Sequence, residues 1–203
     1  MKLPICYYGH PVLRKKGERV DEITDDIRKL AADMIETFDD KNGIGLAAQQ
    51  VGRPLALFVM RHYIHHEDGK WDVTEPFVYI NPKILEYSGE KWVEEEGCLS
   101  IPKLRMPVER PFRIKIEATD LEGKRFTQEL EWHNARAVMH ENDHINGVLY
   151  IDRVEDKFRK PFEAALREIK KKRSWHDPQH DRFWLSEKRS SPGRASFCES
   201  QDP

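Results

Sequence analysis

The spacing of apolar residues along the chain predicts three helices. From about Thr24 to Asp40, apolar side chains recur every three or four positions, as they do on one face of an amphipathic helix. A second helix is expected to have Asn134 as its cap and to end at Gly147, because glycine readily closes a helix. The third covers residues 157–173 and is strongly basic.

Four other apolar segments predict strands. Residues 55–60 and 77–80 are nearly continuous apolar runs, as in buried strands, and the second is expected to stop at the Asn-Pro pair that follows it. Residues 113–118 and 125–130 alternate in polarity and are separated by turn residues, which predicts a hairpin. Short antiparallel strands interspersed with helices indicate the α+β class.

Composition and charge limit what the chain can be. Lysine and arginine total 34, and aspartate and glutamate total 36, so the formal charge of -2 gives no global nucleic-acid footprint. No apolar run is long enough to span a bilayer, and no signal peptide is recognisable, so a cytoplasmic location is expected. The cysteines Cys6, Cys98 and Cys198 lie far apart, which favours free thiols or metal ligands over disulfides.

The strongest chemical signal is His140-Glu141-Asn142-Asp143-His144, within the second predicted helix. Residues four apart lie on one face of a helix, so the two imidazoles can bind one metal ion. With roughly 3.6 residues per turn, Glu141 flanks that face, where a general acid or base is expected. The motif predicts a metal-dependent hydrolase in which short antiparallel sheets surround the helix that carries it.

Two histidines leave a catalytic metal site one protein ligand short. A common protease pattern supplies another histidine downstream, but Tyr150 occupies that position. A carboxylate such as Glu155 or Glu163 would complete a zinc endopeptidase, whereas Cys98 would supply a thiolate. A third interpretation is a structural metal-binding module, in which protein ligands fill every coordination position of the metal. Glu141 would have no role in such a module. The motif alone leaves all three readings open.

Three motifs taken together resemble one family, the peptide deformylases. Residues 43–50 match its Gly-apolar-Gly-apolar-Ala-Ala-x-Gln motif and residues 96–100 match its Glu-Gly-Cys-Leu-Ser motif. Residues 140–144 match its His-Glu-x-x-His motif, and the order of the three motifs agrees with the family. The resemblance covers residues 8–152, most of the chain before the polar C-terminal end.

The resemblance implies an enzyme that removes the formyl group from the N-terminal formyl-methionine of new polypeptides and releases formate. Its metal is expected to be Fe(II), with Zn(II), Ni(II) and Co(II) suited to the same donors. The implied metal ligands are Cys98, His140 and His144. Glu141 would transfer protons, while the Leu99 backbone N–H and the Gln50 amide would stabilise the oxyanion.

The same resemblance implies how the substrate binds. The peptide is expected to lie extended along a strand edge, with the Gly45 backbone as one partner. The implied wall of the methionine pocket consists of Ile44, His133, Arg136 and Ala137. Arg105 matches a family position near the substrate. Glu96 and Asp143 are expected to support the site by pairing with either this arginine or Arg110.

Some positions depart from the family pattern. Met139 stands where relatives often have glutamine, so one supporting hydrogen bond is in question, and Asn142 replaces a larger residue on the side of the helix away from the metal. The long segment 61–75 is interpreted as a solvated loop in preference to a second metal site. Its three histidines are His62, His65 and His66.

The C-terminal segments carry the remaining expectations. The basic residues of 157–173 form either a solvated face or, as in some relatives, a surface that docks on the ribosome. Residues 1–173 are expected to form the catalytic domain and residues 174–203 a polar, weakly ordered tail. The implied partners are formyl-methionyl nascent chains in the bacterial cytoplasm, without a membrane or sequence-specific nucleic acid.

Overall fold

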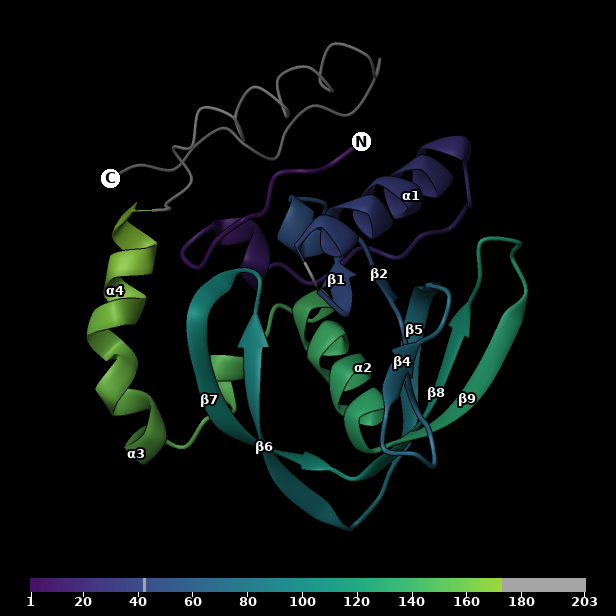
Figure 1. The fold of residues 1–203 in the computed structure, drawn as a ribbon. Helices are drawn as coiled ribbons and strands as arrows, with labels where there is room; N and C mark the ends of the chain where they lie inside the picture. The colour runs from purple at the N-terminus through teal and green to yellow at the C-terminus, as the bar shows by residue number, and fades with distance from the viewer. Residues whose placement is uncertain (42, 173–203) are drawn as a thin grey trace.

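A helix between two β-layers forms the centre of the molecule. The computed structural model describes residues 1–41 and 43–172, so the expected tail lies outside the described residues. Helix α2 (Trp132–Ile145) lies between a five-stranded sheet and a long hairpin (Figure 1). All neighbouring strands of the sheet, in the order β1-β2-β5-β8-β9, are antiparallel. Antiparallel sheets with a few helices agree with the predicted α+β class.

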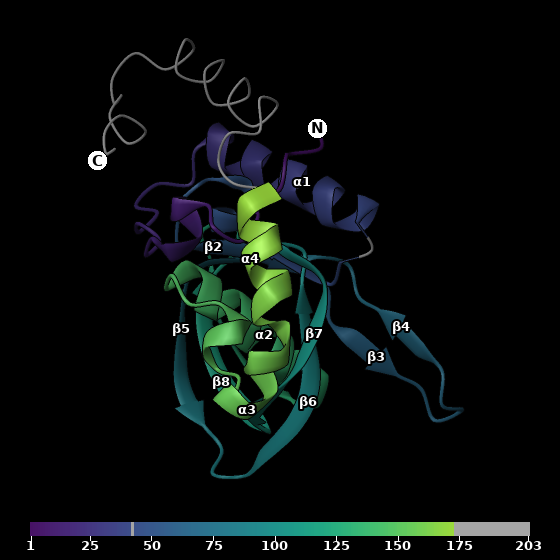
Figure 2. The same cartoon turned by 90° about the vertical axis from the view of Figure 1, so that its left-hand side faces the viewer.

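The strands form three separate sheets. The five-stranded sheet consists of β1 (Gly45–Ala47), β2 (Leu57–Met60), β5 (Phe77–Tyr87), β8 (Arg113–Thr119) and β9 (Arg125–Glu131). The long hairpin consists of β6 (Lys91–Cys98) and β7 (Ile101–Pro111). A short hairpin, β3 (Tyr63–His65) with β4 (Trp71–Val73), projects from the body (Figure 2).

Helix α1 (Asp25–Asp40) has the predicted bounds, and Thr24 caps it. The Thr24 hydroxyl accepts a hydrogen bond from the backbone N–H of Ile27, one of the groups that a helix start leaves unpaired. The apolar face of the helix packs on β1 and β2, where Met34 and Phe38 are fully buried. The period of the apolar residues was therefore sufficient to locate this helix.

The start of α2 differs from the prediction. The helix begins at Trp132, which takes the left-handed conformation with φ 55° and turns the chain sharply out of β9. Asn134 lies inside the helix, and its side-chain amide forms hydrogen bonds with the backbone N–H and C=O of Tyr63 at 2.8 and 3.0 Å. The residue expected as a cap instead fixes the β3–β4 hairpin to α2.

Two proline positions also depart from the sequence prediction. Strand β5 does not stop at Asn81 and Pro82 but continues past them with a shift in register. At this shift the Asn81 side chain pairs with the backbone of Val20 at 2.8 and 2.9 Å. The C-terminal helix is divided at Pro161, which lacks a backbone N–H. Its parts are α3 (Asp156–Arg159), a 3-10 turn (Lys160–Phe162) and α4 (Glu163–Lys172).

The apolar face of α2 packs directly against the five-stranded sheet. Ala135, Val138 and Met139 join the fully buried side chains of Phe58 and Tyr79 in one core cluster. Met139 is thus part of the core and contributes apolar packing. The opposite face of α2, which carries His140 and His144, is left to face the β6–β7 hairpin.

The segment around His62 is not the solvated loop that the sequence suggested. His62 is only 7% exposed, stacks on Phe77 and lies 2.7 Å from the Tyr79 hydroxyl, which donates to the Gln128 side chain at 2.5 Å. His65 on the hairpin is exposed. Burial lowers the pKa of His62 to about 4, so this ring is neutral in the folded protein.

This buried histidine is expected to make the fold sensitive to acid. The unfolded chain binds a proton near pH 6.5 and the folded chain only near pH 4, so stability falls as the pH drops through this window. The loss is about 3 kcal/mol at about 1.4 kcal/mol per pKa unit. Urea unfolding at pH 7 and pH 4 should show that His62→Gln removes this part of the loss. His65→Gln, the exposed control, should behave as wild type.

Candidate metal centre and active site

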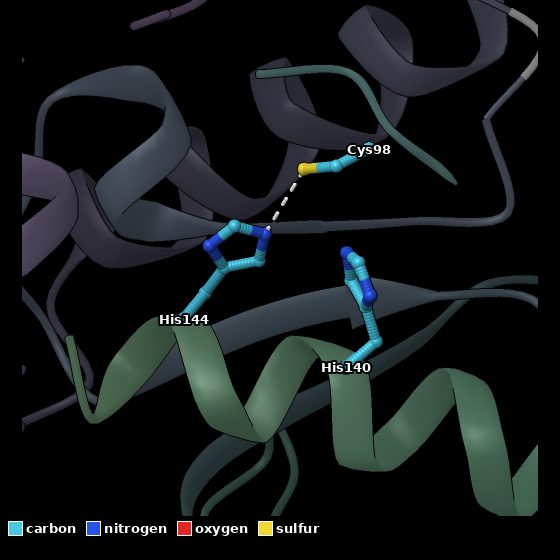
Figure 3. Close-up of side chains that lie close together, drawn as sticks. All are labelled: Cys98, His140 and His144. Carbon is cyan, nitrogen blue, oxygen red and sulfur yellow. Dashed lines mark hydrogen bonds between the residues drawn. The ribbon is translucent and has the colours of Figure 1, made fainter. Parts of the chain in front are cut away.

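Three potential metal ligands converge from two distant segments. His140 and His144 rise from one face of α2, and Cys98 stands opposite them at the end of β6 (Figure 3). One ligand atom from each residue lies within 4.8 Å of the others, and the Cys98 Sγ is 3.2 Å from the His144 Nε2. The thiol is presented by the tight turn between β6 and β7.

The environment of these residues fits a bound transition metal. Burial lowers the pKa of His144 well below its ordinary value, which keeps the imidazole in the neutral form that ligates metals. The His140 Nδ1 lies 2.9 Å from the Glu96 Oε2, so its other ring nitrogen remains for a metal. One thiolate and two imidazoles suit Zn(II), Fe(II) and related ions, and a three-residue set keeps a coordination position open.

The carboxylates required by the endopeptidase reading lie elsewhere. Glu155 pairs with Lys157 at 2.8 Å, and Glu163 pairs with Arg159 and Arg167 at 3.6 Å. Tyr150, at the position of the usual protease histidine, stacks beside His140 at 5.9 Å and donates its hydroxyl to a backbone carbonyl. The geometry therefore brings Cys98 to the two histidines.

A buried ion-pair network supports the metal-binding helix. Arg110 of β7 donates to both Glu96 oxygens at 2.8 and 2.9 Å and to Asp143 at 2.6 Å. All three side chains are at most 7% exposed. Burial alone would raise the pKa of Glu96, but hydrogen bonds from Arg110 and His140 hold this pKa far below its ordinary value. The ionised Glu96 thus links the β6–β7 hairpin to His140, one of the three potential metal ligands.

Two other arginines line the cleft, as the sequence suggested, but differ in their partners. Arg136 is buried and donates to Glu96 at 2.7 Å, while its guanidinium lies over the Trp92 ring at 4.3 Å. Arg105 does not join the network but donates to the Glu95 carbonyl at 2.8 Å from the cleft edge. Of the two partners considered for Glu96 and Asp143, the structure selects Arg110.

The predicted oxyanion donors lie beside Cys98. The Gln50 Oε1 accepts from the Ala47 backbone N–H at 2.8 Å, which orients its amide nitrogen toward the Cys98 Sγ at 3.4 Å. Leu99 follows Cys98 in the turn and lines the cleft. Both groups are therefore placed around the position where a metal would bind.

Glu141 is buried against the edge strand β1. The side chain is 4% exposed and its Oε2 has no hydrogen-bond partner. Burial raises the pKa of this carboxyl group to about 7. A Cβ atom on Gly45 would lie 2.8 Å from the Glu141 Oε1, so the glycine leaves just enough space for the carboxylate. A group with this pKa can both accept and release protons at neutral pH.

Cys98, His140 and Glu141 line a cleft of about 1090 Å³. Its lining includes the residues expected to bind substrate: Ile44, Gly45, Arg105, His133, Arg136 and Ala137. It also includes three residues of the β3–β4 hairpin that the sequence analysis did not single out: Tyr63, Trp71 and Val73. They were missed because the segment 61–75 has no long apolar period and was interpreted as a loop.

Comparison with known proteins decides the family. The family model described as polypeptide deformylase matches residues 2–160. The chain belongs to the peptide deformylase family. It is 46% identical to a peptide deformylase of Acinetobacter baumannii strain SDF over 74% of this chain and 81% of the relative. It is 43% identical to a peptide deformylase of Bradyrhizobium diazoefficiens over 76% of this chain and 91% of that relative.

Solved peptide deformylases have the same fold. The Thermus thermophilus structure superimposes with a TM-score of 0.76 at 37% identity, covering 84% of this chain and 99% of that one. An Acinetobacter baumannii structure described as bound to Met-Ala-Ser superimposes with a TM-score of 0.70 at 31% identity. The match covers 76% of this chain and 99% of that one. The protein is a peptide deformylase, a metal-dependent hydrolase; the endopeptidase alternative is not supported. None of the helices in the described ranges is long and apolar enough to cross a membrane.

Gly45→Ala is expected to impair this deformylase without unfolding it. The new methyl group would collide with the flexible end of Glu141 and displace the carboxylate, with weaker crowding of the Met60 side chain. A displacement of about 1 Å can cost roughly 10²-fold in rate. Deformylation kinetics and metal content should show a lower kcat with metal retained. Gly89→Ala, which meets no neighbour, is the control, and equal activity of the two variants would contradict the prediction.

Proposed function

We propose that this protein hydrolyses the formyl group of N-terminal formyl-methionine in new polypeptides, with a metal bound by Cys98, His140 and His144. The observation that carries the proposal is the meeting of Cys98 with the two α2 histidines beside the buried Glu141. Fe(II) is the proposed metal, with Zn(II), Ni(II) and Co(II) suited to the same donors. The products are formate and a peptide with a free amino terminus.

The residues divide the chemistry between them. A metal bound at this set would lower the pKa of a water molecule toward about 7 and polarise the formyl carbonyl. Glu141 accepts the proton of the attacking water at its carboxylate and delivers it to the leaving amine, for which a pKa of about 7 is suited. The Gln50 amide and the Leu99 backbone N–H donate to the formyl oxygen as negative charge develops there.

Substrate binding uses the free edge of β1. This strand is the outer strand of the five-stranded sheet, so its free edge can pair at Gly45 with the backbone of an extended peptide. The Met-Ala-Ser complex of a relative supports peptide binding in this cleft. The methionine side chain enters between Ile44 and Ala137, toward His133, with the aliphatic part of Arg136 in the wall.

Formate release from formyl-Met-Ala tests the proposal. Protein prepared anaerobically with Fe(II) should release formate, and treatment with a chelator should abolish the reaction. Cys98→Ser exchanges the thiolate for a weak hydroxyl ligand and should lower metal affinity at least tenfold, whereas Cys6→Ser, which changes a buried thiol outside the site, should not. Metal-independent formate release, or unchanged metal content of Cys98→Ser, would reject the assignment.

Two coarser expectations complete the proposal. Residues 1–173 act as the catalytic domain in the bacterial cytoplasm, where formylated chains are made. The basic residues of 157–173 dock on the ribosome, which the charge of this segment supports. The segment cannot be deleted as a test, because Leu166 of α4 is part of the core. Co-sedimentation of Lys157→Glu/Lys171→Glu with ribosomes at low salt tests it; unchanged binding would reject docking.

A further inference from the structure

Strand β9 forms the second outer edge of the five-stranded sheet, at the far end from β1. Among the described residues it pairs with β8 alone, over its whole length. The sharp turn at Trp132 takes the chain from this edge into α2, and Figure 1 shows the β8–β9 hairpin on the outer side of the molecule, away from α3 and α4. The backbone groups on the outer side of an edge strand can pair with a further strand.

One face of β9 carries apolar side chains that are only half-buried. Phe126 and Leu130 pack against the core cluster that contains Tyr79, and the Phe126 ring meets the Tyr79 ring edge-on at 5.4 Å between centroids. Both side chains remain partly exposed, and no further strand adjoins them within the described ranges. An added strand would therefore remove apolar surface from water as well as pair with the backbone.

The other face of β9 carries charges in a self-complementary order. Arg125 begins the strand and Glu131 ends it, with Thr127 and Glu129 between them. The side chains of Arg125 and Glu131 are 75% and 63% exposed, so both can reach a neighbouring strand. In an antiparallel pair of two identical strands, the start of one strand lies opposite the end of the other. Each Arg125 would then face Glu131 of the second copy.

The charged and the apolar side chains favour the same register. Two copies centred on Gln128 make the following pairs, each of which occurs twice: Arg125 with Glu131, Phe126 with Leu130, and Thr127 with Glu129. Opposite charges and apolar pairs directly across strands are stabilising, whereas like charges are destabilising. A register moved by two residues either sets Glu129 against its own copy or leaves Glu131 outside the paired strands. The centred register is therefore the best match.

We propose that β9 pairs with β9 of a second copy of this chain, in the antiparallel register centred on Gln128, and so joins two five-stranded sheets into one. The contact is two-fold symmetric, which is why every residue pair occurs twice. The β1 edges, at which the peptide is proposed to bind, lie at the two outer ends of the joined sheet, so both clefts stay open. The dimer is independent of the proposed function, because β9 takes no part in the chemistry.

The length of β9 limits how tightly the two copies bind. A pair of seven-residue strands buries less than the roughly 1,200 Å² of a stable interface, so we expect a Kd of about 10–100 μM. Sedimentation equilibrium of the metal-loaded full chain, from about 1 to about 500 μM, should show the mass rise from that of one chain toward that of two. The mass of one chain at every concentration would overturn the proposal, whatever else binds this edge.

Charge reversal tests the register. Arg125→Glu and Glu131→Arg each set like charges against one another at both ends of the strand pair, so each variant alone should associate about tenfold more weakly than wild type. Mixed in equal amounts, the two variants restore both Arg–Glu contacts and should form a mixed dimer with about the wild-type Kd. Wild-type association of either variant alone, or no association in the mixture, would overturn the proposal.

Lys91→Glu and Glu109→Lys are the matched controls. They change charges in the same way in an exposed pair of the β6–β7 hairpin, whose atoms lie 2.9 Å apart. Each control should associate as wild type does, and mixing the two should add nothing. Thermal unfolding and formate release from formyl-Met-Ala show that every variant is folded. The rate per chain should be the same below and above the Kd; a rate that falls on association would place the contact at β1 and overturn the proposal.

Discussion

Replacing Glu141 by glutamine is expected to lower kcat for deformylation by about 10²–10⁴-fold while leaving the metal bound. Glutamine has nearly the same shape as glutamate but cannot accept the proton of the attacking water. The residue follows the proposed metal ligand His140 on α2 and is almost fully buried, and that burial raises its pKa to about 7. The loss should therefore appear in the chemical step and not in metal content.

Steady-state kinetics with formyl-Met-Ala, together with metal analysis of the purified variant, measures this effect. Glu95→Gln is a suitable control, because Glu95 also lines the cleft but is exposed and contacts Arg105 at its edge. That variant should stay within about twofold of wild type. If Glu141→Gln kept more than a tenth of the wild-type kcat, another group would have to transfer the proton.

Arg110→Leu is expected to lower the free energy of unfolding by about 3–5 kcal/mol, the cost of breaking a buried ion pair from one side. The substitution leaves two buried carboxylates, Glu96 and Asp143, without their shared cation. Glu96 retains Arg136, and Asp143 retains Arg153, so unfolding of the whole domain is not expected. Weaker anchoring of Glu96 should also lower metal affinity about 10–100-fold, because Glu96 orients His140.

Denaturant titrations at a fixed metal concentration measure the stability change, since bound metal itself stabilises the folded state. The control is Arg113→Leu, which removes an exposed arginine 3.5 Å from Glu131. Surface pairs of this kind contribute about 0–1 kcal/mol. A loss below 1 kcal/mol for Arg110→Leu would mean that the network is not a structural element of the site.

The two predictions separate chemistry from support. Glu141 lines the cleft beside the proposed metal site, so its replacement should change rate and not stability. Arg110 contacts the Glu96 carboxylate, which also contacts His140, and acts through that carboxylate, so its replacement should change stability and metal affinity first. A variant that changed both properties equally would show that support and chemistry cannot be separated in this site.

The sequence by itself determined the features that depend on local spacing. The four-residue interval between His140 and His144 places both rings on one helix face whatever surrounds the helix. The apolar period of residues 25–40 located α1, and three motifs in order identified the peptide deformylase family. These predictions hold because they depend on contacts between residues that are close in the sequence, or on motifs that the whole family shares.

Only the tertiary structure decided which distant residues meet. The motif left Cys98 and several carboxylates as alternatives, and the β6–β7 turn brings Cys98 to the histidines because that hairpin packs against α2. Glu96 pairs with Arg110 although the β6–β7 register places Glu96 opposite Met106 and Arg110 opposite Trp92, so no local pattern encodes this contact. The place of the β3–β4 hairpin at the cleft likewise depends on Asn134, which binds the backbone of Tyr63 more than sixty residues away. Long-range packing and hydrogen bonding, and not periodicity, determine these contacts.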